Sequence, residues 1–333
     1  MRVLITGGAG FIGSHVGRSL QERGDEVVVL DNFNDYYDPK LKRARLAYVL
    51  KPETPVLEVD IVNAEQVEQA VSEVAPDSVL HLAAWAGVRP SRAYPSIFAA
   101  ANIQGTVNVF EACKRTGVTR LIFASSSSVY GPNAPVPSKE SSAGDDQRSS
   151  YGVSKRAGEL YAALYHRSDG LRVTCLRFFT VYGPWGRPDM AVWKFTDQIL
   201  RDQPLTLYVR SDDGREVRRG FTEIRDVVSG TLAALDRDLP FAVLNLGSSD
   251  QVPLRRLVSA LETALGKRAN VEERILPSEE EIQTGADLTE AKALLEYAPT
   301  VQVEAGAQHF ADWYLSKFLE HFPHGLAPSR FWD

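Results

Sequence analysis

The stretch TGGAGFIG at residues 6–13 constrains the fold more than any other part of the sequence. It separates an apolar run at residues 2–6 from a helical pattern at 12–23, and Gly7, Gly10 and Gly13 give it the spacing G-x-x-G-x-x-G. Glycines at this spacing permit a tight strand-to-helix turn and let a pyrophosphate approach the N-terminus of the helix. An ordinary tight turn is the alternative, and the strand-turn-helix context favours the dinucleotide site.

Apolar runs and helical patterns alternate through the first half of the chain. The runs lie at residues 2–6, 26–30, 55–59, 78–82, 120–124 and 172–178, and the helical patterns at 12–23, 40–50, 63–74, 93–116 and 150–167. Buried parallel strands are apolar throughout and need crossover helices, so this order predicts an α/β fold with a doubly wound parallel (Rossmann) sheet. We expect a nucleotide-binding domain over residues 1–178. A smaller substrate-binding α/β lobe follows over 179–333, with a diffuse boundary and C-terminal segments that return to the first domain.

Composition excludes several classes of function. The 333 residues carry a net charge of −6, which argues against a nucleic-acid partner. No apolar run has the roughly 20 residues of a membrane span, and the first strand starts too early to leave room for a signal peptide. Cys113 and Cys175 lie in apolar patterns without metal or redox spacing, so we expect buried thiols, no metal site and a reducing, cytoplasmic location.

A carboxylate at the end of the second predicted strand indicates which dinucleotide binds. Asp31 follows Gly13 by 18 residues, where it can accept hydrogen bonds from the adenosine ribose and repel a 2′-phosphate. This favours NAD over NADP. His81 is interpreted as a structural histidine at a strand end. The remaining predicted NAD contacts follow strand ends or the first glycines, and they are Phe11, Ile12, Asn32, Asp60, Ile61, Leu82, Ala83 and Ala84.

Two short motifs predict the catalytic centre. SSSSVYG at 125–131 follows the fifth strand, and YGVSK at 151–155 places Tyr151 and Lys155 on one face of a helix. An ammonium beside a phenol lowers the pKa of the phenol, so that the phenolate can take a proton from a hydroxyl while hydride leaves the carbon. Taken alone, the Y-x-x-x-K spacing is common by chance and usually belongs to a solvated helix face. Its position after a serine-rich strand end favours catalysis.

These motifs together resemble the extended short-chain dehydrogenases/reductases of the nucleotide-sugar epimerase/dehydratase group. The resemblance implies that Ser126 holds the reacting oxygen, that Tyr151 is the base with Lys155 as its partner, and that both contact NAD. It places Ser127 and Ser128 beside the sugar. It also implies a homodimer that pairs the helices predicted at 93–116 and 150–167.

Three stretches resemble the UDP-glucuronate 4-epimerases within this group: DNFNDYYDPKLKRARL at 31–46, AGVRPS at 86–91 and LRFFTVYGPWGRPDMA at 176–191. The resemblance implies reversible 4-epimerisation of UDP-glucuronate through a 4-keto intermediate, with NAD as the hydride store. In the third stretch, Arg187 can bind the sugar carboxylate with two parallel hydrogen bonds, and Thr180 can add a donor. A structural loop with a surface arginine is the alternative.

Other readings stay open at this point. Relatives acting on neutral UDP-hexoses have Asn where this chain has Thr180, which disfavours a UDP-glucose or UDP-galactose 4-epimerase. Decarboxylases have Glu where this chain has Ser127, and a non-catalytic NAD-binding regulator would usually lack the tyrosine or the lysine. Arg219 matches the arginine expected on the UDP phosphates, although the pattern departs from the family at Gly220, Glu223 and Arg225. Arg89 adds positive charge near the cofactor or the diphosphate.

Overall fold

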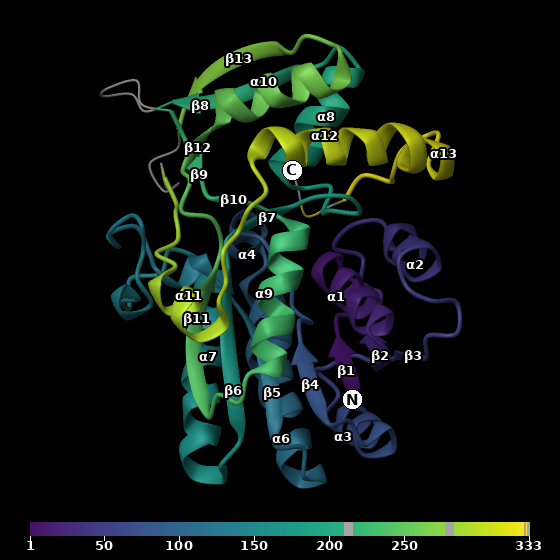
Figure 1. Ribbon diagram of the computed structural model, residues 1–333, viewed down its shortest axis with the longest axis vertical. Helices are drawn as coiled ribbons and strands as arrows, with labels where there is room; N and C mark the ends of the chain where they lie inside the picture. The colour runs from purple at the N-terminus through teal and green to yellow at the C-terminus, as the bar shows by residue number, and fades with distance from the viewer. Residues whose placement is uncertain (210–215, 277–282, 330, 332–333) are drawn as a thin grey trace.

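A parallel sheet of seven strands forms the body of the protein in the computed structural model, which describes residues 1–209, 216–276, 283–329 and 331 (Figure 1). The strand order is β11-β6-β5-β4-β1-β2-β3, and every pairing within this sheet is parallel. The predicted doubly wound sheet is therefore confirmed. Its strands are β1 (Arg2–Thr6), β2 (Glu26–Asp31), β3 (Val56–Glu58), β4 (Ser78–His81), β5 (Arg120–Ser126), β6 (Arg172–Phe178) and β11 (Phe241–Leu246).

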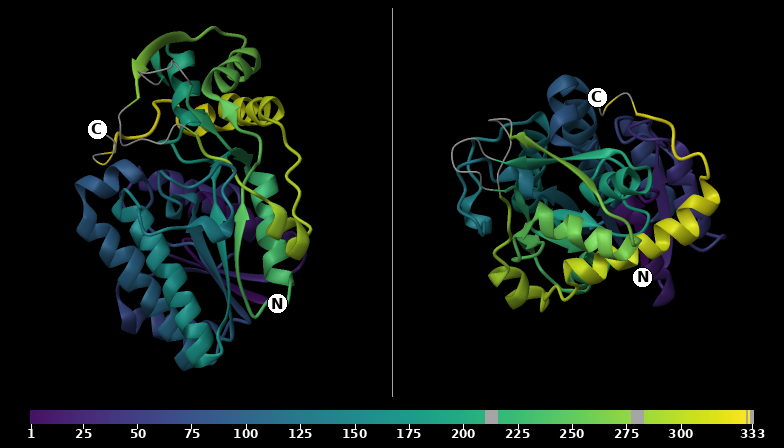
Figure 2. Two further views of the ribbon diagram at one scale, coloured as in Figure 1. Left: turned by 90° about the vertical axis from the view of Figure 1, so that its left-hand side faces the viewer. Right: turned by 90° about the horizontal axis from the view of Figure 1, so that it is seen from above.

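Helices cover both faces of this sheet (Figure 2). Val3 and Ile5 of β1 face the core beneath α1 (Phe11–Glu22) and α9 (Ile224–Asp236), whereas Leu4 faces the opposite core. That second core lies beneath α3 (Ala64–Val74), α6 (Gly105–Thr116) and α7 (Ser150–Asp169). Alternate residues of a strand point to opposite faces, so a strand buried on both sides must be apolar throughout, as β1 is.

The helix predicted at residues 93–116 is interrupted. A short helix, α4 (Val88–Ala93), ends before Tyr94, and α5 (Pro95–Ala99) begins at the proline. Proline disfavours helical backbone at the residue before it, which explains the break at Tyr94. A π-helical turn at Ala100–Gln104 then joins α5 to α6.

A second lobe stands above the carboxyl edge of the sheet (Figure 1). It contains α8 (Ala191–Leu200), α10 (Leu254–Leu265) and α12 (Val303–Trp313), with the parallel pair β8 (Pro204–Val209) and β13 (Asn270–Ile275). Aromatic side chains dominate its core, including Trp193, Phe310 and Trp313. β11 and α11 (Thr289–Leu295) leave this lobe, and β11 pairs with β6 at the edge of the main sheet.

The remaining elements are short. They are α2 (Pro39–Tyr48), 3₁₀ turns at Ser127–Val129 and Glu140–Ser142, β7 (Thr180–Tyr182), β9 (Arg218–Arg219), β10 (Phe221–Glu223), β12 (Val252–Pro253), a π-helical turn at Tyr314–Phe318 and α13 (Leu319–His321). β7 pairs with β10, and β9 pairs with β12. Among the residues with described structure, no helix has the length and apolarity to span a membrane. The same residues contain no group of three or more His, Cys, Asp or Glu arranged to bind a metal.

Candidate active site

A cavity of about 460 Å³ opens at the carboxyl edge of the sheet. It is lined by the turn after β1, by the ends of β2, β4, β5 and β6, by α7, and by residues of the second lobe. The structure brings nearly all predicted site residues to this cavity. Those lining it are Gly7, Gly10, Phe11, Ile12, Gly13, Asp31, Asn32, Asp60, Ile61, Leu82, Ala83, Ala84, Ser126, Ser127, Ser128, Tyr151, Lys155, Thr180, Arg187 and Arg219.

The glycine turn has the geometry of a dinucleotide cradle. Gly7 has a φ of +71°, and a Cβ there would lie 2.7 Å from the backbone nitrogen of Ala83. A Cβ on Gly10 or Gly13 would lie 2.8 or 2.5 Å from the carbonyl oxygen of Gly7. Gly10 is the N-cap of α1, so the turn ends where backbone N–H groups of the helix are free to meet an anion. The residues present fit a bound NAD pyrophosphate.

Hydrogen bonds hold the side chain of Asp31 beside the glycine turn. Its Oδ2 accepts a hydrogen bond from the Ala9 N–H at 3.2 Å, and its Oδ1 accepts one from the Phe33 N–H at 2.9 Å. The Lys42 Nζ lies 3.7 Å from Oδ1 and donates to the Asn34 Oδ1 at 3.0 Å. The buried carboxylate therefore has partners that hold it in the position expected of a ribose acceptor.

A second acidic position lies on the neighbouring strand edge. The Asn32 side chain donates to the Asp60 Oδ2 at 2.9 Å, and the Val62 N–H donates to the Asp60 Oδ1 at 2.9 Å. Both Asn32 and Asp60 line the cavity. This pair gives the cavity a polar edge beside the ends of β2 and β3.

His81 lies beneath the cavity in a chain of buried hydrogen bonds. The Thr106 hydroxyl donates to the Asn102 carbonyl oxygen at 2.7 Å and so accepts from the His81 Nε2–H at 3.1 Å. The Thr6 hydroxyl donates to Nδ1 at 2.7 Å and accepts from the Ala83 N–H at 3.2 Å. Burial lowers the pKa of His81 to about 3. The imidazole is therefore neutral, and its contacts agree with the structural role expected from the sequence.

Ser126, Tyr151 and Lys155 all line the cavity, where the end of β5 faces α7. Ser126 is the last residue of β5. Its Oγ accepts a hydrogen bond from the Ser128 N–H at 3.2 Å and forms a second hydrogen bond with the Tyr151 hydroxyl. The hydroxyl of Ser149 caps α7 by accepting from the Gly152 N–H at 3.1 Å, which fixes the turn that carries Tyr151. Tyr151 also packs edge-on against Phe98, with ring centroids 6.3 Å apart.

Burial governs the proton affinities of both α7 groups. It raises the pKa of Tyr151, while the hydrogen bond with Ser126 and the charge of Arg187 act in the opposite direction. It lowers the pKa of Lys155 to about 7. The sequence predicted that Lys155 would lower the pKa of Tyr151. The structure differs because desolvation of the phenol outweighs the opposing interactions, and because the Lys155 Nζ donates to the Ala124 carbonyl oxygen at 2.7 Å.

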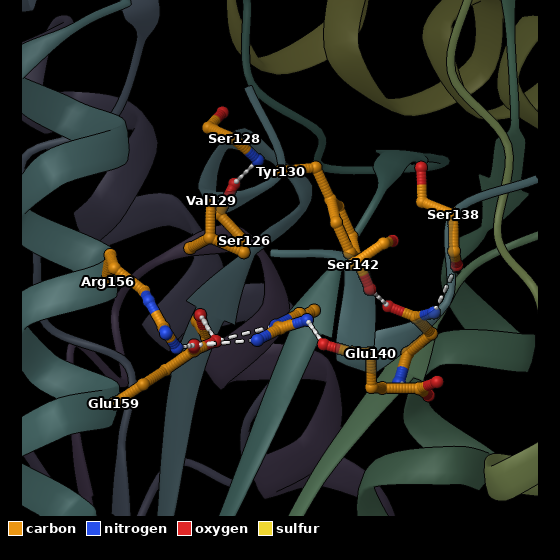
Figure 3. Close-up of polar contacts among 12 residues, drawn as sticks. Ser126, Ser128, Val129, Tyr130, Ser138, Glu140, Ser142, Arg156 and Glu159 are labelled. Atoms are coloured by element: carbon orange, nitrogen blue, oxygen red, sulfur yellow. Dashed lines mark hydrogen bonds and ion pairs between the residues drawn. The ribbon is translucent and has the colours of Figure 1, made fainter. Parts of the chain in front are cut away.

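A buried ion pair joins α7 to β6 close to Ser126 (Figure 3). The Arg177 Nε and Nη2 donate to the two carboxylate oxygens of Glu159 at 2.7 and 2.8 Å. The hydroxyl of Ser125 donates to the same carboxylate at 2.6 Å, and Arg156 does so at 3.1 Å. Strands β5 and β6 are thereby tied to α7 one turn beyond Lys155.

The loop between β7 and α8 brings Arg187 to the cavity. The Arg187 Nε donates to the Asp189 Oδ1 at 3.0 Å, and its Nη2 donates to Oδ2. The Tyr36 hydroxyl also donates to the Asp189 Oδ2, at 3.1 Å, and the guanidinium lies 5.6 Å from the Tyr36 ring centre. Burial disfavours the charge of Arg187, but Asp189 outweighs this effect, so the pKa of the guanidinium is raised. Arg187 is therefore a cation with one edge held by a carboxylate.

The remaining substrate positions differ in their placement. Ser127 and Ser128 form a 3₁₀ turn after β5, Thr180 begins β7, and Arg219 ends β9, all at the cavity wall. Arg89 is absent from the described lining residues, and its guanidinium lies 5.8 Å from the ring centre of Tyr208. Its role as a substrate contact stays a prediction.

The cavity also has lining residues that sequence reasoning did not select. They include Asn34, Tyr36, Lys42, Trp85, Arg92, Arg148 and Met190. Tyr36 and Lys42 lie within the family-like stretch at 31–46, so that stretch contained the signal for them. Arg92 lies about one helical turn after Arg89 on the same short helix, α4. Which of the two arginines lines the cavity depends on how α4 is placed in the fold, and the sequence did not indicate this.

Comparisons with known proteins agree with this geometry. The NAD dependent epimerase/dehydratase family matches residues 3–247. UDP-glucuronate 4-epimerase 3 of Arabidopsis thaliana is 43% identical over an alignment of 331 positions, which covers 95% of this chain and 77% of the relative. Protein CapI of Staphylococcus aureus is 35% identical, covering 96% of this chain and 99% of the relative.

Two solved structures have the same fold. The UDP-glucuronic acid 4-epimerase of Bacillus cereus, in complex with UDP-glucuronic acid and NAD, has a TM-score of 0.86 and 35% identity over 94% of this chain and 98% of its own. The UDP-glucose 4-epimerase of Thermus thermophilus, in complex with NAD, has a TM-score of 0.86 and 31% identity over 95% of this chain and all of its own. The two TM-scores are equal, so they do not separate the two sugars, whereas the sequence identity is higher to the UDP-glucuronate 4-epimerases.

Proposed function

The chain belongs to the NAD dependent epimerase/dehydratase family, and we propose that it is an isomerase that interconverts UDP-glucuronate and UDP-galacturonate through a 4-keto intermediate. One observation carries the choice of reaction. The glycine turn, the Ser126–Tyr151 pair and the Arg187 cation all line a single cavity. NAD fits the cradle of glycines and Asp31, and when bound it supplies a reversible hydride acceptor.

We assign the proton transfer to Tyr151. Its phenolate oxygen takes the proton of the sugar 4-hydroxyl during oxidation and returns a proton to the 4-oxygen after the sugar presents its other face. Ser126 shares the hydrogen bond with Tyr151 and so fixes the position of the reacting oxygen. We assign Lys155, which lines the same cavity one helical turn after Tyr151, to contact the bound NAD.

We assign the sugar carboxylate to Arg187 and Thr180. Asp189 occupies the Nε–Nη2 edge of the guanidinium, and a guanidinium has a second two-nitrogen edge, Nη1–Nη2, that matches a carboxylate. In the 4-keto intermediate, the bond from C5 to the carboxylate can break, and its electron pair then passes into an enolate as CO₂ leaves. That loss requires the bond to stand perpendicular to the carbonyl plane. A carboxylate held by Arg187 is kept from this orientation while the ring turns.

A UDP-glucose or UDP-galactose 4-epimerase is the second candidate, because the Thermus thermophilus enzyme has an equally similar fold. A neutral hexose has no carboxylate, so it would leave the Nη1–Nη2 edge of the Arg187 guanidinium without an anionic partner. A UDP-glucuronate decarboxylase would need an acidic group after Ser126, and the following lining residues are Ser127 and Ser128. A catalytically silent NAD-binding protein would have no need of the Ser126–Tyr151 pair.

A proton NMR time course with UDP-glucuronate, and separately with UDP-glucose, tests this assignment. We expect UDP-galacturonate to form from the former, little UDP-pentose, and slow or no turnover of the latter. Faster turnover of UDP-glucose would overturn the choice of substrate.

Arg187→Ala tests the carboxylate contact. We expect KM to rise and the fraction of UDP-pentose to increase, since the carboxylate is no longer held. Arg187→Lys keeps the charge but cannot form two parallel hydrogen bonds with a carboxylate. Its KM should therefore lie closer to the wild-type value than the KM of Arg187→Ala, whereas its pentose fraction should stay raised. Unchanged kinetics and no additional pentose in Arg187→Ala would remove Arg187 from the substrate site.

The proposal includes a cytoplasmic homodimer. The free, buried thiols of Cys113 and Cys175 support a reducing location. Val153, Leu160 and Leu164 are 48%, 56% and 48% exposed on α7, which supports contact between α7 helices of two subunits. Light scattering should give a dimer for the wild type and a monomer for Leu160→Glu; a monomeric wild type would refute this part of the proposal.

A further inference from the structure

Arg45 on α2 has an unusual environment for an arginine. Its side chain has 0% exposure. Arg177, the other fully buried arginine among the described residues, has the carboxylate of Glu159 as its partner. Within the described chain, the hydrogen-bond acceptors of Arg45 are instead neutral oxygens, so its charge is balanced by dipoles and by the Tyr37 ring, 5.1 Å away. Burying a cation in this way is costly, and a simple packing role would be met by an apolar side chain.

The acceptors of Arg45 belong to two loops that are far apart in the sequence. Its Nε donates to the Trp185 carbonyl oxygen at 2.8 Å, and its Nη2 donates to the Gly186 carbonyl oxygen at 2.8 Å. Its Nη1 donates to the Ala9 carbonyl oxygen at 3.4 Å and to the Tyr37 hydroxyl. One guanidinium therefore connects the glycine turn to the two peptide units directly before Arg187.

The backbone that Arg45 contacts is strained. Trp185 has a φ of +59°, in the left-handed region that L-residues with a side chain rarely adopt. The Gly186 N–H donates to the Gly183 carbonyl oxygen at 3.0 Å, which closes a tight turn. Packing also holds the turn, because the Trp185 ring stacks on Tyr48 with centroids 5.9 Å apart and lies 5.2 Å from that of Trp313. A planar fork that donates to consecutive carbonyl oxygens fixes the peptide planes, which ring packing does not do.

From these contacts we propose that Arg45 is a positioning residue, which sets the direction of Arg187 by holding the Trp185 and Gly186 carbonyls against the glycine turn. This inference rests on the proposed function, because it concerns how the sugar carboxylate is held. Arg45 does not touch the sugar in this account. Its effect passes through the backbone of the loop to the guanidinium that lines the cavity.

Arg45→Met removes the guanidinium but keeps a side chain of similar volume. Arg45→Lys keeps the positive charge, but its single ammonium group cannot donate to both carbonyl oxygens in the same geometry. We expect both variants to raise the UDP-pentose fraction and to raise KM more than they lower kcat. Calorimetry gives a readout independent of turnover: UDP-glucuronate should bind about tenfold more weakly, as expected on loss of a charged hydrogen-bonded contact, whereas UDP alone should bind as to the wild type. Arg43→Met is the matched control, because Arg43 lies on the same helix with a side chain that is 61% exposed.

A double variant separates positioning from general stability. If Arg45 acts through Arg187, then Arg45→Met should add nothing to the pentose fraction or the binding defect of Arg187→Met. The inference would be overturned if Arg45→Met had the same effects on the pentose fraction and on binding in the Arg187→Met variant as in the wild type. It would also be overturned if Arg45→Met lowered the thermal stability but left the pentose fraction and the binding unchanged. Arg45→Lys provides the same comparison if Arg45→Met does not fold. Failure of the wild type to form UDP-galacturonate would instead contradict the proposed function.

Discussion

At the scale of single residues, the site sets the proton affinity of Tyr151 by opposing effects. Burial raises the pKa of the phenol, whereas the Ser126 hydrogen bond and the Arg187 charge lower it. The group that binds the sugar carboxylate in our proposal thus also favours the phenolate. A neutral residue at position 187 is expected to affect both substrate binding and the base.

Tyr151→Phe removes the hydroxyl that we propose as the base and keeps the ring that packs on Phe98. We expect kcat to fall by about 10²–10⁴, the usual contribution of a general base, with the UDP-glucuronate Kd within a factor of about three, since the carboxylate and UDP contacts are intact. Steady-state kinetics and calorimetry measure the two quantities. Tyr161→Phe, on the same helix, is the control, and a Tyr151→Phe enzyme with near-normal kcat would refute the assignment.

At the scale of elements, the network around Glu159 joins three parts of the site. Arg177 on β6 and Ser125 on β5 both donate to the Glu159 carboxylate on α7. The Arg177 Nη1 also donates to the Glu140 carbonyl oxygen at 2.8 Å, which attaches the loop after β5. These bonds hold the end of β5 and the helix of Tyr151 at a fixed separation (Figure 3).

Arg177→Met tests how much this network stabilises the fold. Both side chains of the ion pair are 2% exposed. Removing one partner leaves a buried charge without compensation, so the free energy of unfolding should fall by about 3–5 kcal/mol. Urea unfolding measures this change. The double variant Arg177→Met/Glu159→Gln should recover part of the loss; a single variant as stable as the wild type would show that the pair is not a structural constraint.

Elements with strong periodicity could be predicted from the sequence, whereas contacts between segments far apart in the sequence could not. The glycine turn and the apolar strands were predictable because their local pattern determines their structure. The pairing of β11 beside β6 joins residues 241–246 to 173–178, and no local pattern encodes that choice. Likewise, no local pattern indicated Arg92, which follows the stretch AGVRPS and lines the cavity. The Arg187–Asp189 pair and the contacts of Arg45 depend on the folded loop, which its two prolines did not reveal.

At the scale of the whole molecule, buried ionisable groups connect stability to pH. His81 is 1% exposed, and burial lowers its pKa to about 3 in the folded protein. In the unfolded chain its pKa is about 6.5. Below pH 6.5 the unfolded state therefore binds a proton that the native state does not. His81 should reduce the free energy of unfolding by about 1.4 kcal/mol per pH unit as pH falls from 6.5 toward 3.

His81→Asn should remove this dependence. Urea unfolding at several pH values between 6.5 and 4 gives the slope of the unfolding free energy against pH. This slope should be smaller in His81→Asn than in the wild type, by the amount that corresponds to the uptake of about one proton on unfolding. His324 is exposed, so His324→Asn should keep the wild-type slope. Equal slopes in His81→Asn and the wild type would mean that His81 is protonated in the native state.

The central claim is epimerisation at C4 without net oxidation. Incubation with UDP-[4-²H]glucuronate in ordinary water, without added NAD, tests it most directly when the products are followed by NMR and mass spectrometry. We predict UDP-galacturonate that retains deuterium at C4, because the hydrogen removed from C4 returns to C4 without exchange with solvent, and only traces of UDP-pentose. Loss of the label to water, or UDP-pentose as the main product, would contradict the account.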